Sequence, residues 1–182
     1  MVRKKVMMYR LAFVVVVLLV GSVSLTLGKQ VVAKKTPAAP SINNITQAAV
    51  QSGVLACTSR IEQVSNFITK DGKSGVFLFT PPSEPDQRMF SASLEITHPN
   101  STKAYASLSF APNQANGCGA LYETVTYSAA TCKDVLAKDY SGLKPIGKLG
   151  EQTLILDIGS TSRIFLMPAD KGCITIKKEV LL

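Results

Sequence analysis

Hydrophobic and polar positions alternate with a period of two along much of the chain after residue 74. Four runs carry this pattern, at residues 75–80, 89–97, 103–111 and 120–127. In the second and third runs the apolar side chains share one face, formed by Phe90, Ala92, Leu94, Ile96, Ala104, Ala106, Leu108 and Phe110. Serines and Tyr105 take the other face. This alternation predicts an antiparallel sheet with one buried and one polar face.

Three further runs near the C-terminus continue the pattern, at residues 152–158, 162–167 and 173–180. Gly159-Ser160 and the segment 170–172 separate these runs and have the composition of tight turns. His98-Pro99-Asn100-Ser101 is a turn sequence between the second and third runs. We therefore expect an antiparallel sheet of about six to seven strands.

A helical spacing precedes the sheet. Apolar residues recur every three or four positions, as Val50, Val54, Cys57, Ile61, Val64 and Ile68. Asn44 and Gln47 fit a capping box at the start of this stripe. The pattern predicts one long helix over residues 45–68 that packs on the sheet. A coiled coil is the alternative, but sustained coiled coils repeat over about three to four heptads, more than this stripe offers.

A second, short helix is expected between the two groups of strands. Thr131 and Asp134 form another capping box, and Ser141-Gly142 ends the segment. Helices interrupt the strands without a regular β-α-β alternation, which predicts an α+β fold. We expect a single domain over residues 44–182 with both helices packed on the sheet.

Residues 1–28 have the order of a Sec-type leader, a basic start followed by an uncharged, largely apolar stretch at 11–28. The stretch lies at the lower edge of the roughly 17 to 25 residues that span a bilayer, so a cleaved signal peptide and a retained membrane anchor are both open. The leader pattern favours cleavage. The basic flank is expected to stay in the cytoplasm, so the rest of the chain is expected to be exported. It would then lie in the periplasm or outside the cell, either free or anchored in the inner membrane by residues 11–28.

Residues 29–43, rich in proline and alanine, are predicted to be a tether.

The charge of the chain is concentrated in this N-terminal part. The formal net charge is +8, but seven Lys or Arg and no Asp or Glu precede residue 36. From residue 36 onward 13 Lys or Arg face 12 Asp or Glu, a net charge of 13 − 12 = +1. Nucleic-acid binding needs a basic face, so this role is excluded, and contact with a membrane is expected only through the N-terminal segment.

Four cysteines, Cys57, Cys118, Cys132 and Cys173, all follow the leader. An even number in an exported chain predicts two disulfides. We expect Cys118 to pair with Cys132 across a short loop, and Cys57 to tie the first helix to the last strand through Cys173. Zinc is the alternative, but the spacings lack a C-x-x-C pair and His98 is the single histidine, so no metal or other cofactor is expected.

Three residues could carry chemistry. Cys132 at a helix N-terminus could be a thiolate, although a disulfide is the stronger interpretation. His98 could be a general base, although loop exposure is the simpler account. Glu123 shares a strand face with apolar neighbours, where a carboxylate has a raised pKa. The alternatives for Glu123 are an edge strand, or exposure of the opposite face of the run, and no second carboxylate at a suggestive spacing completes a catalytic pair.

The segment between the first two runs is a candidate contact loop. This segment is predicted to be a stiff, polar loop that contains Pro81, Pro82, Glu84 and Pro85. Rigid exposed loops are frequent contact surfaces. A plain strand-ending loop is the alternative.

The absence of a catalytic set beside a well-patterned domain leads us to expect a non-enzymatic, exported protein-binding or assembly domain, whose partner is another envelope or secreted protein. The alternatives are a small envelope enzyme that uses Glu123 or His98, and an inhibitor or carrier with an apolar pocket. A flat apolar patch or a free strand edge would favour the binding domain, convergent polar groups in a cleft the enzyme, and a deep closed cavity the carrier.

Overall fold

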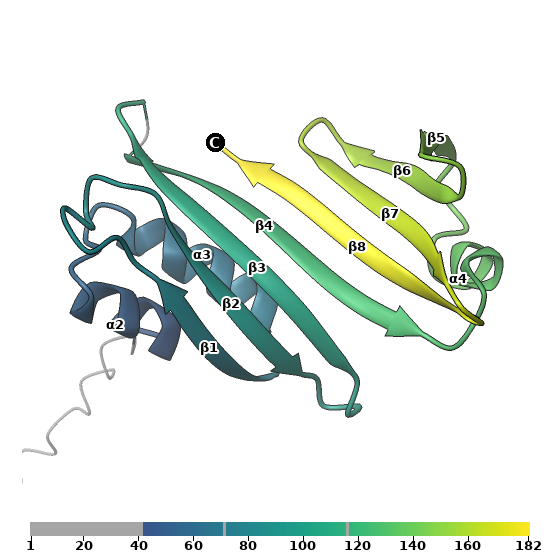
Figure 1. Cartoon of the computed structure of the whole chain (residues 1–182), viewed down its shortest axis with the longest axis horizontal. Coiled ribbons are helices and arrows are strands. Elements are labelled where there is room, and N and C mark those ends of the chain that lie inside the picture. Colours follow the sequence, from purple (N-terminus) through teal and green to yellow (C-terminus); the bar gives the residue numbers. More distant parts are fainter. Residues whose placement is uncertain (1–41, 71, 116) are drawn as a thin grey trace, which may run out of the picture. The chain divides into compact units, whose positions relative to one another are not determined.

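The computed structural model describes residues 42–70, 72–115 and 117–182 (Figure 1). The predicted leader at residues 1–28 and nearly all of the predicted tether lie outside this part of the chain. Among the described residues, no helix combines the length and the apolar character needed to cross a membrane.

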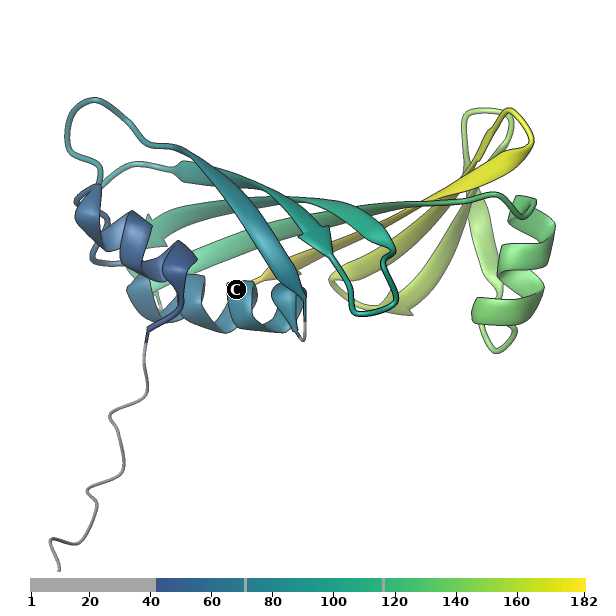
Figure 2. The same ribbon diagram turned by 90° about the horizontal axis from the view of Figure 1, so that it is seen from below.

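The fold is α+β, as predicted, with one antiparallel sheet and three short helices in the described part of the chain. The helices are α2 (Asn44–Gln51), α3 (Thr58–Thr69) and α4 (Cys132–Asp139). The strands are β1 (Lys73–Phe79), β2 (Phe90–Thr97), β3 (Lys103–Asn113), β4 (Gly117–Ser128), β5 (Pro145–Leu149), β6 (Thr153–Gly159), β7 (Ser162–Ala169) and β8 (Gly172–Leu181). Their order across the sheet is β1-β2-β3-β4-β8-β7-β6-β5. The helices all lie on one face of the sheet (Figure 2).

The prediction of six to seven strands is wrong by one element, because the sheet has eight. The missed strand is β5, which forms one edge of the described sheet and pairs, among the described strands, only with β6. Pro145 and Gly147 lie within it, and both residue types argue against a strand from sequence alone. An edge strand tolerates them because one side of its backbone needs no ladder hydrogen bonds.

The prediction of one long N-terminal helix is also wrong, because the helical stripe is divided into α2 and α3. Gly53 interrupts it with φ of +85°, a left-handed conformation that commonly ends a helix at glycine. The backbone N–H of Ser52 donates to the carbonyls at the end of α2. The cap of α2 is Asn43 rather than Asn44, and its side chain accepts from the backbone N–H of Thr46. Val50 belonged to the predicted apolar stripe, but in the structure its side chain is exposed near the end of α2.

The short helix α4 forms where it was predicted. The Thr131 side chain caps it by accepting from the backbone N–H of Asp134 at 3.2 Å, and the two side chains hydrogen bond to each other at 2.6 Å. Cys132 and Val135 are its buried residues, so this helix has only a narrow apolar stripe.

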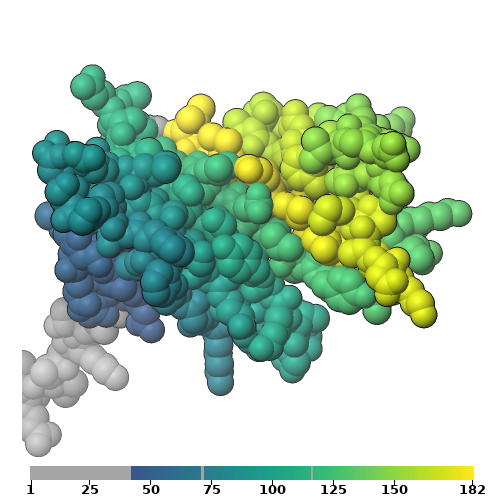
Figure 3. Space-filling view, viewed as in Figure 1, coloured from purple at the N-terminus to yellow at the C-terminus, as the bar shows by residue number. Residues whose placement is uncertain are grey.

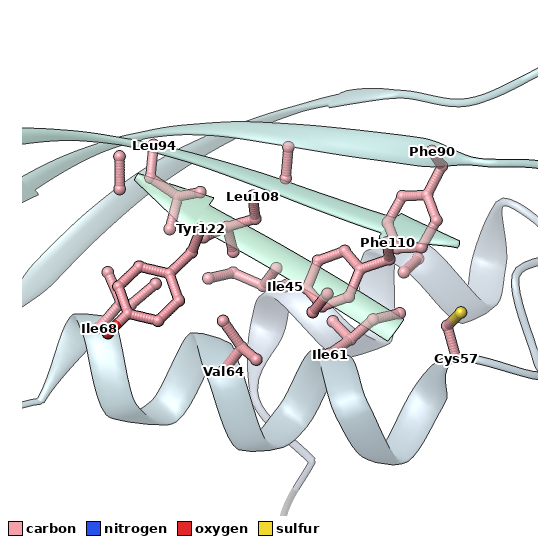
Figure 4. Close-up of a cluster of buried hydrophobic side chains, with 14 of the residues drawn as sticks. Ile45, Cys57, Ile61, Val64, Ile68, Phe90, Leu94, Leu108, Phe110 and Tyr122 are labelled. Atoms are coloured by element: carbon pink, nitrogen blue, oxygen red, sulfur yellow. The ribbon is translucent and has the colours of Figure 1, made fainter. Parts of the chain in front are cut away.

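The first of two cores lies between α2, α3 and strands β1 to β4 (Figure 4). The alternating residues of β2 and β3 point to the helices as predicted, and Phe90 stacks on Phe110 with ring centroids 5.0 Å apart. From α3, Ile61, Val64 and Ile68 enter the same cluster. Its fully buried side chains exclude water from the helix-covered half of the sheet, and this burial is the main source of its stability.

A second, smaller core lies under α4 at the other end of the same face. Leu156, Ile164 and Leu166 of the sheet pack against Val135 of α4, with Leu136 and Tyr140 partly buried beside them. The face that carries the helices thus has two separate apolar regions.

Both disulfides form, so all four cysteines are paired, but the predicted connectivity is wrong. Cys57 bonds to Cys118, and Cys132 bonds to Cys173. Cys118 lies near the start of β4, whereas Cys132 follows the other end of this strand, and ten residues of strand span about 33 Å. A disulfide needs Cα atoms within about 7 Å, which rules out a bond between these two. Each disulfide instead fastens one helix to the sheet at one core.

Candidate functional site

A polar strip, which we call the polar seam, separates the two cores on the helix-bearing face. It lies on the central strands β4 and β8, between the part of the sheet that packs on α3 and the part that packs on α4, and consists of Thr124, Thr126, Thr175, Lys177 and Glu179. These residues face the same way as the apolar residues on either side, because directly paired residues of antiparallel strands point to one face. The seam explains why one sheet carries two cores instead of one.

Tyr122 joins the first core to the polar seam. Its ring is buried among core residues, and its hydroxyl donates a hydrogen bond to the Glu179 carboxylate. The Lys177 ammonium lies 3.3 Å from that carboxylate, and 5.4 Å from the centroid of the Tyr122 ring. It is also 5.2 Å from the centroid of the Phe67 ring, an arrangement typical of a cation–π contact.

The ionisation of this cluster follows from its surroundings. Burial is the largest cause that raises the pKa of Tyr122, and the hydrogen bond and charge of Glu179 raise it further. Burial also raises the pKa of Glu179, but hydrogen bonds from Tyr122, Lys177 and Ser162, together with the Lys177 charge, outweigh it and lower the pKa below its ordinary value. The cluster therefore holds a protonated phenol, a carboxylate and an ammonium whose charges compensate each other.

Two hollows flank Phe67 above the polar seam. One, of about 230 Å³, lies between Phe67, Tyr122 and Glu179, and the other, of about 240 Å³, extends from Phe67 to His98 and Thr126. Ligand pockets usually have about 300 to 1,000 Å³. Both hollows are smaller than this range, and the charged groups beside them already satisfy each other.

The opposite face of the sheet carries no helix, and we call it the helix-free face (Figure 3). Over β2 and β3 it is polar as predicted, with a serine strip of Ser91, Ser93, Ser107 and Ser109. Over the other strands the prediction of a polar face is wrong, because apolar side chains replace the serines.

A continuous apolar patch covers β4, β8, β7 and β6 on the helix-free face, with Tyr105 of β3 at its border. We define this apolar patch as Tyr105, Val125, Tyr127, Ile155, Phe165, Met167, Ile174 and Ile176, which follow one another in the strand register. Tyr105 is 48% exposed and Tyr127 is 62% exposed. A hollow of about 390 Å³ lies in the patch between Tyr105, Val125, Tyr127 and Ile174. No described residue covers this face.

The charged residues beside the apolar patch on the helix-free face form ion pairs with one another. Lys103 lies 2.7 Å from Glu95 and Lys178 lies 3.4 Å from Glu123. Arg163 lies 2.9 Å from Asp157. These six charges near the apolar patch therefore form three ion pairs with no net charge.

The structure places Glu123 on the helix-free face of a central strand, with its side chain about one-third exposed and paired with Lys178. The edge-strand alternative is wrong, because β4 lies between β3 and β8. His98 lies in the predicted turn between β2 and β3 and lines a hollow on the opposite face. Glu123 and His98 are thus separated by the sheet and do not form a common site.

The proline-rich loop has a clear internal role. The Asp86 carboxylate accepts hydrogen bonds from the backbone N–H groups of Leu55 and Ala56 in the connection between α2 and α3. Glu84 forms an exposed ion pair with Arg88 at 2.8 Å, and the side chain of Pro85 lies against Gly53. The loop therefore fastens the connection between α2 and α3. Its predicted contacts with a partner, through Pro81, Pro82, Glu84 and Pro85, stay a prediction.

The sequence contained a signal for the apolar patch. Leu154-Ile155-Leu156 and Phe165-Leu166-Met167 are continuous apolar runs, and such runs indicate strands with two apolar faces. Among the described residues, no cluster of three or more His, Cys, Asp or Glu side chains could hold a metal ion. No family model, curated protein or solved structure matches the chain.

Proposed function

We propose that this chain is a non-enzymatic, exported protein-binding or assembly domain that binds another envelope or secreted protein through the apolar patch. The observation that carries the proposal is the uncovered patch itself. Contiguous exposed apolar surface is unusual on a soluble domain without a partner, and it typically marks an interaction site. Two disulfides are consistent with an oxidising compartment outside the cytoplasm.

The composition of the patch indicates the chemistry of the partner. Tyr, Phe and Met are enriched in the buried centres of protein interfaces, and Tyr105, Tyr127, Phe165 and Met167 supply them here. Because the surrounding charges are internally paired, electrostatic attraction contributes little. The partner is therefore a protein with a matching apolar, uncharged surface.

The two alternatives have less support. Enzymatic use of Glu123 or His98 lacks convergent groups, because these residues lie on opposite faces of the sheet. A carrier role needs an enclosed apolar cavity. The hollows beside Phe67 are small and partly lined by charged groups, and the larger hollow in the apolar patch lies between the exposed side chains of Tyr105 and Tyr127 and is not enclosed.

Photocrosslinking in the native cell tests the proposal directly. A photoreactive phenylalanine analogue replaces Tyr127 in the full chain, and a second variant carries the analogue at Ser109, in the serine strip. We expect a discrete adduct with another protein from position 127 and none from position 109. Met167→Lys in the position-127 chain places a charge in the patch and is expected to remove the adduct.

Three outcomes would contradict the proposal. These are the absence of an adduct at position 127, adducts of equal yield at both positions, and an adduct that contains only a second copy of the chain. The last result would assign the patch to self-association.

A further inference from the structure

The two edges of the sheet differ in how they are protected against pairing with another strand. At one edge, β5 is only five residues long, contains Pro145, and has a register shift between Pro145 and Gly147. Lys144 and Lys148 add positive charge there. Short strands, prolines, bulges and lysines are the devices by which natural proteins block an exposed edge.

The other edge, β1, has almost none of these devices. Its seven residues pair with β2 without a register shift, and the sheet order ends at β1, so no described strand lies beyond it. The sequence is KSGVFLF, with a single lysine at its start and no proline. Phe77 is 64% exposed and Phe79 is 55% exposed, and their rings contact each other edge to face with centroids 5.0 Å apart. This edge is a template for strand addition.

We propose that β1 pairs antiparallel with β1 of a second copy of this chain, with the two-fold axis at Val76. All seven residues of β1 then take part, and Val76 lies opposite Val76 of the second copy. The two eight-stranded sheets become one continuous sheet, with the helices of both copies on the same face. Backbone hydrogen bonds along the strand supply the attraction.

The sequence of β1 is complementary to itself in this register. Gly75 lies opposite Phe77 of the second copy, and a side chain placed at Gly75 would meet nothing within 4 Å, so open space exists for the phenylalanine ring. The two Phe77 rings are diagonal neighbours, a separation that aromatic side chains can bridge. Lys73 lies opposite Phe79 of the second copy, where its ammonium can lie over the ring.

This self-complementarity favours a second copy over an unrelated strand. The partner strand must place a large side chain opposite Gly75 and leave space opposite Phe77. A second copy of β1 meets both requirements, because its Phe77 lies opposite Gly75 and its Gly75 lies opposite Phe77. The inference goes beyond the proposed function and does not depend on it, because the serine strip separates β1 from the apolar patch.

Disulfide trapping tests the register. In the full chain with its native disulfides closed, Val76→Cys places two cysteines opposite each other at a Cα separation of about 4.5 to 5.5 Å, within the range for a disulfide. Ser74→Cys is the matched control, because Ser74 lies opposite Leu78 of the second copy. Two cysteines at position 74 are about 13 Å apart along the strand and out of reach. We expect a crosslinked dimer on a non-reducing gel for Val76→Cys and none for Ser74→Cys.

Light scattering gives an independent measurement. The unmodified chain is expected to have twice the molar mass of Phe77→Lys, whose charge would lie against Gly75 of the second copy. Circular dichroism and peptide mapping show that each variant keeps its fold and native disulfides. Equal crosslinking at positions 74 and 76, no crosslinking at position 76, or equal molar masses in the folded proteins would overturn the proposal, whatever binds the apolar patch.

Discussion

The hydroxyl of Tyr122 donates a hydrogen bond to the carboxylate of Glu179 at the border between the first core and the polar seam. The bond links paired positions on the two central strands, β4 and β8. The buried phenol of Tyr122 and the charged carboxylate of Glu179 therefore lie side by side, where the first core meets the polar seam.

Replacement of Tyr122 by Phe removes this donor while it keeps the ring. Hydrogen bonds to charged groups contribute about 1.5 to 3 kcal/mol, so we expect the free energy of unfolding to fall by about that amount. Tyr105→Phe is the control, because its hydroxyl bonds to Ser93 at an exposed position. Urea unfolding of both variants measures the difference, and equal values for the two would contradict the role of Glu179 as a strong acceptor.

The stability of the fold is expected to depend on pH through Glu179. The pKa of this carboxyl is lower in the folded state than in the unfolded state, because the hydrogen bonds and the Lys177 charge outweigh the opposing effect of burial. The resulting stability is present above the unfolded pKa of about 4.3 and is lost as the pH falls through the folded pKa. Glu179→Gln should therefore lose less stability than the wild type between pH 6 and pH 3. Urea unfolding at each pH measures this difference. An equal fall in the free energy of unfolding of Glu179→Gln and of the wild type would contradict the prediction.

The disulfide connectivity can be checked by mass mapping of a non-reduced digest. We expect Cys57 to be joined to Cys118 and Cys132 to Cys173. The bonds close loops with sequence separations of 61 and 41 residues, so each removes about 4 kcal/mol of chain entropy from the unfolded state in the loop-closure model. Paired replacement of either bond by alanine should lower the free energy of unfolding by about 2 to 5 kcal/mol. A peptide that joins Cys118 to Cys132 would contradict the continuous strand β4 that separates them.

Asp86 is expected to stabilise the connection between α2 and α3. Asp86→Ala leaves the backbone N–H groups of Leu55 and Ala56 without their carboxylate, at a cost of about 1 to 3 kcal/mol. Glu84→Gln in the same loop breaks only an exposed ion pair with Arg88, worth about 0 to 1 kcal/mol. Thermal unfolding of both variants compares the effects, and a larger loss for Glu84→Gln would show that the loop is held differently.

Gly172 is expected to tolerate no side chain. A methyl group there would overlap the backbone oxygen of Ser128 and the ring of Tyr127, and the backbone oxygen cannot move without breaking the pairing of β4 with β8. Gly172→Ala should cost about 1 to 3 kcal/mol, which is typical of overpacking. Gly147→Ala is the control, because a side chain there meets no atom within 4 Å. Equal Tm values for the two variants would contradict the close approach.

Several elements were predictable because their cause is local. The faces of β2 and β3 follow from strict alternation, and the cap of α4 follows from Thr131 three residues before Asp134. The turn at His98 follows from its proline and asparagine. A period of two, a capping side chain and a turn residue act within a few residues, so the sequence alone shows them.

Other predictions failed where two local signals in the sequence indicate different structures. Gly53 divides α2 from α3, although the apolar spacing continues across it, because a left-handed residue redirects the chain. Pro145 and Gly147 conceal β5, because residues that disfavour a central strand are acceptable at an edge.

The sequence by itself determined the alternating strands, the short helix, the nearly neutral charge of the chain after residue 36 and the presence of two disulfides. Only the tertiary structure decided that β8 inserts between β4 and β7. That order sets Cys173 beside the end of β4, creates the polar seam by bringing Tyr122 to Glu179, and joins the apolar patch across four strands. Strand order depends on contacts between residues far apart in the chain, and local patterns carry no information about which distant strand becomes the neighbour.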